Sequence, residues 1–347
     1  MRILCGIWLA AALASGQSGK AKKDAVPRQG IKTPGVQIPI ASLKAEAELP
    51  LAPRFIVFAD SVLIPNKQGG LVRLDAKTNK LADPVGGAQN LCGGWATGFT
   101  SLWIADCAAH GLARLDEKVA ADPKKIPEKA GDKEKPKLAE PVSIATGVGS
   151  AIPAIAPTAD SIWILSDDKT TLSRVDPDQN KVVSELRLPA GCNSLTSGEA
   201  ALWVTCPAEN RVLRVNPATT LIEKRIEVST QPAALALGEA SIWVLCLKDG
   251  KIERIDPKTN KVTKTIETGV TGAATGGLAF GAGSLWVTLP GFPLTRIDPK
   301  DERVAQQFWG AGGGAIFFGQ GSLWLTNVQE GTLWRVDPRR AMATLAE

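Results

Sequence analysis

The sequence has a single histidine, His110, and none of its six cysteines forms a Cys-x-x-Cys pair. Zinc and most other transition-metal sites are built from histidine and cysteine at such spacings, so we expect no metal site and no cofactor. The sequence also lacks a serine nucleophile elbow, a phosphate-binding loop, a haem-attachment motif and a His-Glu-x-x-His motif. No motif therefore identifies a catalytic residue.

A strong net charge is absent as well. The formal charge of +5 is small for 347 residues, and Lys and Arg are interspersed with Asp and Glu. A nucleic-acid-binding domain needs a concentrated basic surface. We therefore expect no nucleic-acid partner.

The apolar run at the N-terminus is too short to span a membrane, so we expect no transmembrane segment. It extends from Ile3 to Leu13, follows a charged start and ends at the small-x-small sequence Ala12-Leu13-Ala14. Residues 1–14 are thus predicted to be a signal peptide of a periplasmic or secreted protein; the alternative is a short buried helix. Cleavage would remove Cys5 and leave five cysteines in an oxidising compartment.

Residues 15–35 lack apolar periodicity and contain Lys, Gly and Pro. A segment of this composition buries too little apolar surface to fold by itself. We expect a flexible, solvated leader, with a basic segment that touches membrane or wall polymer as the alternative.

Two short motifs recur along the rest of the chain, as in Ser241-Ile242-Trp243-Val244 and Arg254-Ile255-Asp256-Pro257. Most copies are about 40 residues apart, the period of four-stranded propeller blades. The positions equivalent to the Trp are Leu63, Trp103, Trp163, Trp203, Trp243, Trp286 and Trp324. The positions equivalent to the Arg are Arg73, Arg114, Arg174, Arg214, Arg254, Arg296 and Arg335.

The local pattern within one unit predicts four strands. The first two strands are the apolar runs at residues 233–237 and 241–245. The third is residues 251–256, and a turn signature follows at residues 256–260. In the fourth, residues 261–268, apolar and polar side chains alternate strictly. The change from continuous apolar strands to an alternating strand is typical of a radial blade. Its inner strands are covered by both neighbouring blades, and its outer strand is exposed to water. We therefore predict an all-β protein, a seven-bladed β-propeller of four-stranded antiparallel blades over residues 36–347.

The last blade is short of one strand, because only Ala341–Glu347 follow its third. The strand-like segment Val36–Ile40 precedes blade one. We expect this N-terminal segment to join the outer edge of blade seven and to close the ring.

Blade two contains an insertion. Trp103 and Trp163 are 60 residues apart, and the excess maps to residues 117–140, which mix Lys, Glu and Asp with Pro and Gly. This insertion replaces the turn between the third and fourth strands. We expect a disordered, solvated loop, with a partner-docking loop as the alternative.

The recurring Trp and Arg are expected to be structural. A propeller has one active centre near its axis, whereas these residues occupy equivalent positions in every blade. A buried Trp between blades contributes about 2 to 3 kcal/mol. Arg can pair with the turn Asp of its own or the next blade, or cover apolar surface with its stem. The alternative is a ring of arginines that binds a polyanion.

Four cysteines occupy matching places in blades two and four. Cys192 lies eleven residues before Trp203 and Cys206 lies three after it; Cys92 and Cys107 lie eleven before and four after Trp103. An antiparallel hairpin places each pair opposite one another, which predicts the disulfides Cys92–Cys107 and Cys192–Cys206, with a bulge in residues 97–100. Cys246 faces Pro232 and is predicted to be a free thiol.

A binding site is expected where the seven copies differ. The connections between second and third strands share one face with the loops that enter each first strand, and propellers usually bind ligands there; we call it the loop face. Its blade-specific candidates are Asp106, His110, Asp167, Asp168, Glu209, Asn210, Lys248, Asp249, Phe292, Asn327, Gln329 and Glu330. The entry loops add Trp95, Asn193 and Trp309.

The unit Gln231–Val244 resembles the repeat of the streptogramin (virginiamycin B) lyase-like propellers, and Asp256–Val262 is similar to the strand-turn-strand signature of YncE/YVTN-type periplasmic propellers. The resemblance covers about residues 36–345 and implies the fold. The lyases use a histidine, acidic residues and a divalent metal to open a cyclic ester by elimination. The later blades, where that family has its catalytic histidine, contain none here, so no catalytic residue is transferred.

We therefore expect a monomeric, non-enzymatic module that binds a protein, peptide or cell-envelope ligand on its loop face. The alternative is a streptogramin lyase-like or lactonase-like enzyme, in which Asp, Glu and Asn side chains hold a divalent metal in the axial channel.

Overall fold

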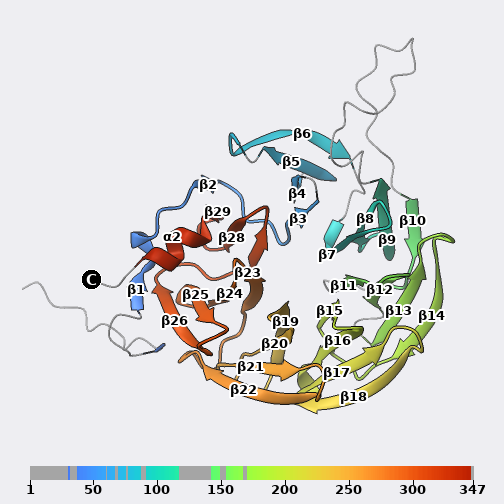
Figure 1. The fold of residues 1–347 in the computed structure, drawn as a ribbon. Helices are drawn as coiled ribbons and strands as arrows, with labels where there is room; N and C mark the ends of the chain where they lie inside the picture. Colours follow the sequence, from blue (N-terminus) through green and yellow to red (C-terminus); the bar gives the residue numbers. More distant parts are fainter. Residues whose placement is uncertain are drawn as a thin grey trace, which may run out of the picture.

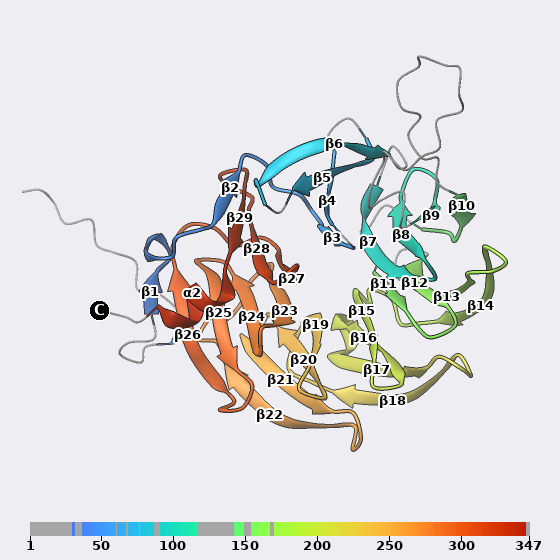
Figure 2. The same ribbon diagram turned by 45° about the horizontal axis from the view of Figure 1, so that its top comes forward.

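The computed structural model of the protein describes residues 30–31, 37–59, 61–66, 69–75, 77–86, 91–116, 142–148, 154–166 and 170–344. Seven β-sheets stand around a ring, as predicted, and the turned view shows the same ring from a second direction (Figures 1 and 2). The predicted signal peptide, most of the leader and the insertion at 117–140 lie outside the described residues.

Blades one to five take their four strands in chain order, with the first strand near the axis and the fourth at the rim (Figure 1). Blades six and seven take four and three strands in the same order, and each gains one more strand from the N-terminal part of the chain. Blades one and two contain β3 (Val57–Phe58), β4 (Val62–Pro65), β5 (Leu71–Asp75) and β6 (Lys80–Gly86), then β7 (Leu91–Gly98), β8 (Ser101–Asp106), β9 (Gly111–Asp116) and β10 (Val142–Ala145). Blades three and four contain β11 (Ile155–Pro157), β12 (Ile162–Ser166), β13 (Thr171–Asp176) and β14 (Lys181–Arg187), then β15 (Ser194–Gly198), β16 (Ala201–Cys206), β17 (Arg211–Asn216) and β18 (Leu221–Glu227). Blades five and six contain β19 (Pro232–Gly238), β20 (Ser241–Cys246), β21 (Lys251–Asp256) and β22 (Lys261–Glu267), then β23 (Gly277–Gly281), β24 (Ser284–Leu289), β25 (Phe292–Asp298) and β26 (Arg303–Trp309). Blade seven contains β27 (Ile316–Gly319), β28 (Ser322–Asn327) and β29 (Thr332–Val336), which is followed by the helix α2 (Pro338–Ala343).

The second strand of each blade forms the core. All six residues of β20 are buried, whereas β22 at the rim is mostly exposed. The Trp of the repeat is completely buried in each of the six blades that have it, and Leu63 is equally buried in blade one. In five of them the indole N–H donates to the carbonyl of the Gly five residues earlier, at 2.9–3.1 Å. The Trp thus fills the space between blades with its one polar group satisfied.

The recurring Arg stacks on this Trp in most blades, and in four blades, through Arg114, Arg214, Arg254 and Arg335, it also donates a hydrogen bond to the next blade. In five blades the guanidinium carbon lies 4.7–5.8 Å from the ring centre, within the range of a cation–π contact. Arg254 also donates to Ser241 Oγ at 2.9 Å and to Glu302 of blade six at 2.8 Å. In blade six, Arg296 instead pairs with the turn residue Asp298 of its own blade at 3.3 Å. These contacts agree with the predicted structural role.

An N-terminal strand closes the ring, as predicted, but it lies further along the chain than the predicted segment. The strand β1 (Gln37–Pro39) pairs in parallel with β26 and makes blade six five-stranded. After the short 3₁₀ helix η1 (Ile40–Ser42), the strand β2 (Ala47–Leu49) pairs with β29 and completes blade seven. The assignment of residues 36–40 to blade seven is therefore wrong. The apolar side chain of Ile38 instead packs with Phe308 and Leu294 of blade six.

Both predicted disulfides, Cys92–Cys107 and Cys192–Cys206, are present. The predicted bulge in residues 97–100 is wrong, because residues 99–100 form the same two-residue turn with positive φ as residues 199–200. The extra residue is accommodated beside Cys92, where the register of β7 shifts on both sides of Gly93. Gly93 and Gly94 have positive φ angles that glycine adopts without strain.

Cys246 lies opposite Pro232, is buried, and is the free cysteine among the described residues. Burial, with Glu253 and Asp249 nearby, raises the pKa of its thiol far above the usual value. The reactive form of cysteine is the thiolate. We expect iodoacetamide at pH 8 to leave native protein of residues 15–347 unlabelled, and to label only Cys246 after unfolding without reductant. Peptide mapping checks both results; a second labelled cysteine before reduction would contradict the disulfides.

Candidate ligand-binding face

The loop face has its longest fully described connection at the entry to blade six, and the connection into blade seven lines a common hollow with it. The chain leaves β22 at Glu267 and enters β23 at Gly277, whereas only four residues separate β18 from β19. Both connections are rich in glycine, and Gly269, Gly272 and Gly310 have positive φ. The glycines therefore give both loops backbone freedom, and the loop that enters blade six is also unusually long.

These loops enclose a hollow of about 550 Å³, which we call the blade-six pocket. Its walls come from the loop before β23, from the turn between β24 and β25, and from the end of β26. The lining residues are Val270, Thr271, Gly272, Ala273, Ala274, Pro290, Gly291, Phe292, Trp309 and Gly310.

The pocket is mostly apolar. Phe292 is buried and Trp309 is half-buried, and no charged side chain belongs to the lining. Its polar side-chain groups are the hydroxyl of Thr271 and the indole N–H of Trp309. A side chain at Gly272 or Gly291 would meet no atom within 4 Å, so glycine keeps these walls open. Apolar walls with a few polar groups are typical of ligand pockets.

Two leader residues are docked beside this pocket. The backbone N–H of Gly30 donates to the Gly269 carbonyl, and that of Ile31 donates to Gln307 Oε1 at 2.9 Å. Gln307 is completely buried, and its amide N–H₂ donates to the carbonyl of Thr268 at 2.9 Å. The Ile31 side chain packs against the cluster that contains Phe292 and Trp309.

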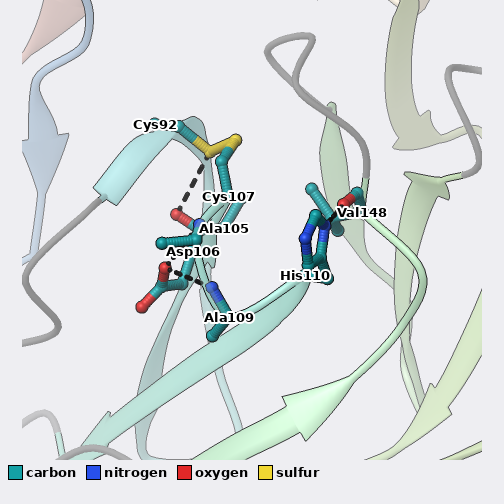
Figure 3. The surroundings of a disulfide bond; sticks show 8 residues. Cys92, Ala105, Asp106, Cys107, Ala109, His110 and Val148 are labelled. Carbon is teal, nitrogen blue, oxygen red and sulfur yellow. Dashed lines mark hydrogen bonds between the residues drawn. A yellow bond between two sulfur atoms is a disulfide. The ribbon is translucent and has the colours of Figure 1, made fainter.

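Asp106 and His110 lie in one hairpin of blade two but do not act together. Asp106 is buried, and its Oδ1 accepts the backbone N–H groups of Ala108 and Ala109, both at 3.0 Å. His110 is exposed and its Nδ1 is 2.8 Å from the carbonyl oxygen of Val148. Figure 3 shows the ring turned to Val148 and the carboxylate turned to the hairpin's own backbone. Both side chains therefore stabilise loops.

Asn210 and Asp249 hold the entry loop of blade five. Asn210 Oδ1 accepts the N–H of Gln231 at 3.0 Å, and Asp249 Oδ2 accepts the N–H of Thr230 at 2.7 Å. The second bond holds the pKa of Asp249 below its usual value, so the carboxylate is ionised at neutral pH.

The side-chain contacts of the remaining polar candidates lie within their own blades. Glu209, in the short 3₁₀ helix η4 (Pro207–Glu209), lies 4.0 Å from Arg211. Asn327 donates to Glu330 at 2.7 Å within their own turn. Asp167 and Asp168 lie outside the described residues.

The two Trp candidates differ in position. Trp309 ends β26 and lines the blade-six pocket. Trp95 was expected in an entry loop, but it lies inside β7 and stacks edge-on against Phe58, with ring centres 6.2 Å apart. The register shifts around Gly93 allow β7 to begin at Leu91, which turns the expected loop into strand.

Across the described parts of the chain, no three or more His, Cys, Asp or Glu side chains come close enough to hold a metal ion. These residues therefore do not supply the donor set that a lyase-like metal site needs. Sequence reasoning missed the loop 270–274, although its length and its glycines were visible signals.

The comparisons with known proteins support the fold. No protein-family model matches the chain, and no curated protein matches its sequence. Among solved structures, the chain is similar to a streptogramin B lyase, with 17% identity, a TM-score of 0.62, and coverage of 83% of this chain and 94% of the lyase. It is also similar to the Pan2 WD40 domain of Neurospora crassa (12% identity, TM-score 0.60, 83% and 90% covered).

A third similar structure is BamB from Moraxella catarrhalis, with 12% identity, a TM-score of 0.55 and 81% of both chains covered. At these identities the shared property is the fold, which confirms the predicted resemblance to lyase-like propellers at that level. None of the helices among the described residues is long and apolar enough to cross a membrane.

Proposed function

We propose that this propeller is an exported, non-enzymatic module that binds a protein, peptide or cell-envelope ligand on its loop face. The observation that carries the proposal is the blade-six pocket, an apolar hollow of about 550 Å³ on the face where the blades differ. A pocket of this size and lining suits a ligand, and a shared fold alone does not transfer an activity.

The turns on the opposite face support the assignment of ligand binding to the loop face. In five blades the turn between third and fourth strands begins with an Asp or Asn whose Oδ1 accepts the N–H two residues later, at 2.7–3.0 Å. These turns satisfy their own backbone groups and repeat from blade to blade. In these five blades the opposite face repeats one turn and offers little to distinguish a particular ligand.

Two disulfides support export. Disulfides form and persist in oxidising compartments and are rare in reducing ones, and each of the two closes a hairpin on the loop face. They therefore fix two loops of the proposed binding surface.

Site-specific photocrosslinking tests the proposal. We place p-benzoylphenylalanine at exposed Thr271 or Gln329 on the loop face, and at exposed Thr219 or Lys258 on the opposite face, in the protein's native host. We expect a reproducible adduct from the loop-face positions only. Adducts that form equally from Thr219 and Lys258, or no adduct at any position, would contradict the proposal.

A further inference from the structure

The chemistry of the blade-six pocket limits what can fill it. An ionic ligand would lose its hydration without gaining a charged partner, because no lining side chain is charged. A sugar ring needs several directed hydrogen bonds, and the lining side chains provide one hydroxyl, that of Thr271. Aromatic and small apolar residues instead suit an uncharged apolar group.

The chain itself shows how a peptide is recognised at the adjoining wall. Gly30 and Ile31 present their backbone N–H groups to the Gly269 carbonyl and to Gln307 Oε1. Gln307 is a preorganised acceptor, because its N–H₂ group is held by the Thr268 carbonyl and lies 3.4 Å from Thr295 Oγ1. One apolar side chain, Ile31, then packs on the same cluster as Phe292 and Trp309.

These two features are continuous. Phe292 lies against Gly30 on one side and lines the pocket on the other, and Gly269 precedes the pocket residue Val270. An extended chain needs about 3.3 to 3.6 Å per residue, so a peptide a few residues long can lie beside Gly30 and Ile31 and place one side chain in the pocket. The volume of about 550 Å³ accommodates one large side chain with its flanking backbone.

We infer that the blade-six pocket receives an uncharged aromatic or aliphatic side chain of an extended peptide segment from a partner protein. This inference rests on the proposed function and names its ligand class. The acceptors Gly269 and Gln307 hold this chain's own Gly30 and Ile31, so the partner segment lies beyond them, where Phe292 with Trp309 forms the receptor for its side chain. Selectivity at this pocket is for size and lack of charge.

The test titrates the folded protein with three acetylated, amidated pentapeptides, Gly-Ala-X-Ala-Gly, in which X is Phe, Gly or Asp, by isothermal calorimetry. Burying an aromatic side chain is worth about 2 to 3 kcal/mol, so we expect the Phe peptide to bind at least about tenfold more tightly than the Gly and Asp peptides. Equal affinity for the three peptides would overturn the inference.

A blocking variant locates the site. Ala274 is exposed and lines the pocket. The Ala274→Trp variant should therefore fill the pocket, keep its melting temperature, and bind the Phe peptide at least about tenfold more weakly. Ala218→Trp, at an exposed turn on the opposite face, is the matched control and should bind like the unchanged protein. Identical binding by the Ala274→Trp variant would place the peptide elsewhere and overturn the inference.

Other occupants give distinct results. Binding of an N-acetylglucosamine hexamer that Ala274→Trp abolishes, with no peptide bound, would assign the pocket to a glycan. Peptide binding that requires deletion of residues 15–29 would assign it to the chain's own leader. Either result overturns the inference. Loop-face crosslinks without peptide binding would leave the proposed function standing while this inference fails.

Discussion

Replacing Leu49 with Asp should weaken the closure of the ring and lower the melting temperature by about 6 to 10 °C. Leu49 is buried, pairs with Leu333 and packs against Ile56 and Trp324. The change removes apolar contacts and places a charge between the first and last blades, which costs about 3 to 5 kcal/mol. In a domain of this kind each kcal/mol shifts the midpoint by about 2 °C or more. Scanning calorimetry measures the shift.

The control for this experiment lies on the same strand. Glu48 pairs with Trp334 but is exposed, so Glu48→Gln should change the stability by no more than about 0.5 kcal/mol. A melting temperature of the Leu49→Asp variant within a degree of the unchanged protein would mean that β2 does not hold the ring closed.

Replacing Trp243 with Ala is expected to destabilise the protein by about 3 to 5 kcal/mol. The ring is completely buried, its N–H donates to the Gly238 carbonyl at 3.1 Å, and Arg254 lies over it at 5.4 Å. The variant would leave a cavity between blades and remove the surface on which the guanidinium stacks. Urea unfolding monitored by circular dichroism measures the loss.

Trp243→Phe serves as the graded variant, because it keeps an aromatic ring and loses only part of the volume; we expect about half of the loss of the Ala variant. If Trp243 is structural, the folded Ala variant should bind the Phe pentapeptide as the unchanged protein does. Weakened binding with unchanged stability would instead support a functional role for the repeated Trp positions.

The blade count and the cysteine pairing could be predicted because both depend on local register. The Trp and Arg motifs recur in each unit, and the two-residue turn at residues 199–200 sets which residues face each other across the hairpin. The same logic placed Cys246 opposite Pro232. The same reasoning misplaced the bulge of blade two and the position of Trp95. The extra residue is accommodated at Gly93 and Gly94, where glycine adopts positive φ without strain.

The closing strand and the pocket could not be predicted in the same way. Residues 47–49 combine Ala, Glu and Leu, which is a weak strand signal, and β2 forms because β29 offers it an edge. The pocket joins residues from three connections, at Val270, Pro290 and Trp309. These residues converge only because the outer strand of one blade packs beside the entry loop of the next. No local sequence pattern indicates how far apart those two segments lie.

The pairing of Ala47 with Arg335 joins an N-terminal strand to the last blade. The ring can therefore close only after nearly the whole chain has been synthesised. Contacts between residues distant in sequence form late in folding, and β2 is synthesised long before the three strands it must join. Until β29 is synthesised, blade one has an uncovered flank that chaperones and proteases can recognise. A chain truncated before β29 could not form the β2–β29 pairing and would keep an open edge between its first and last blades.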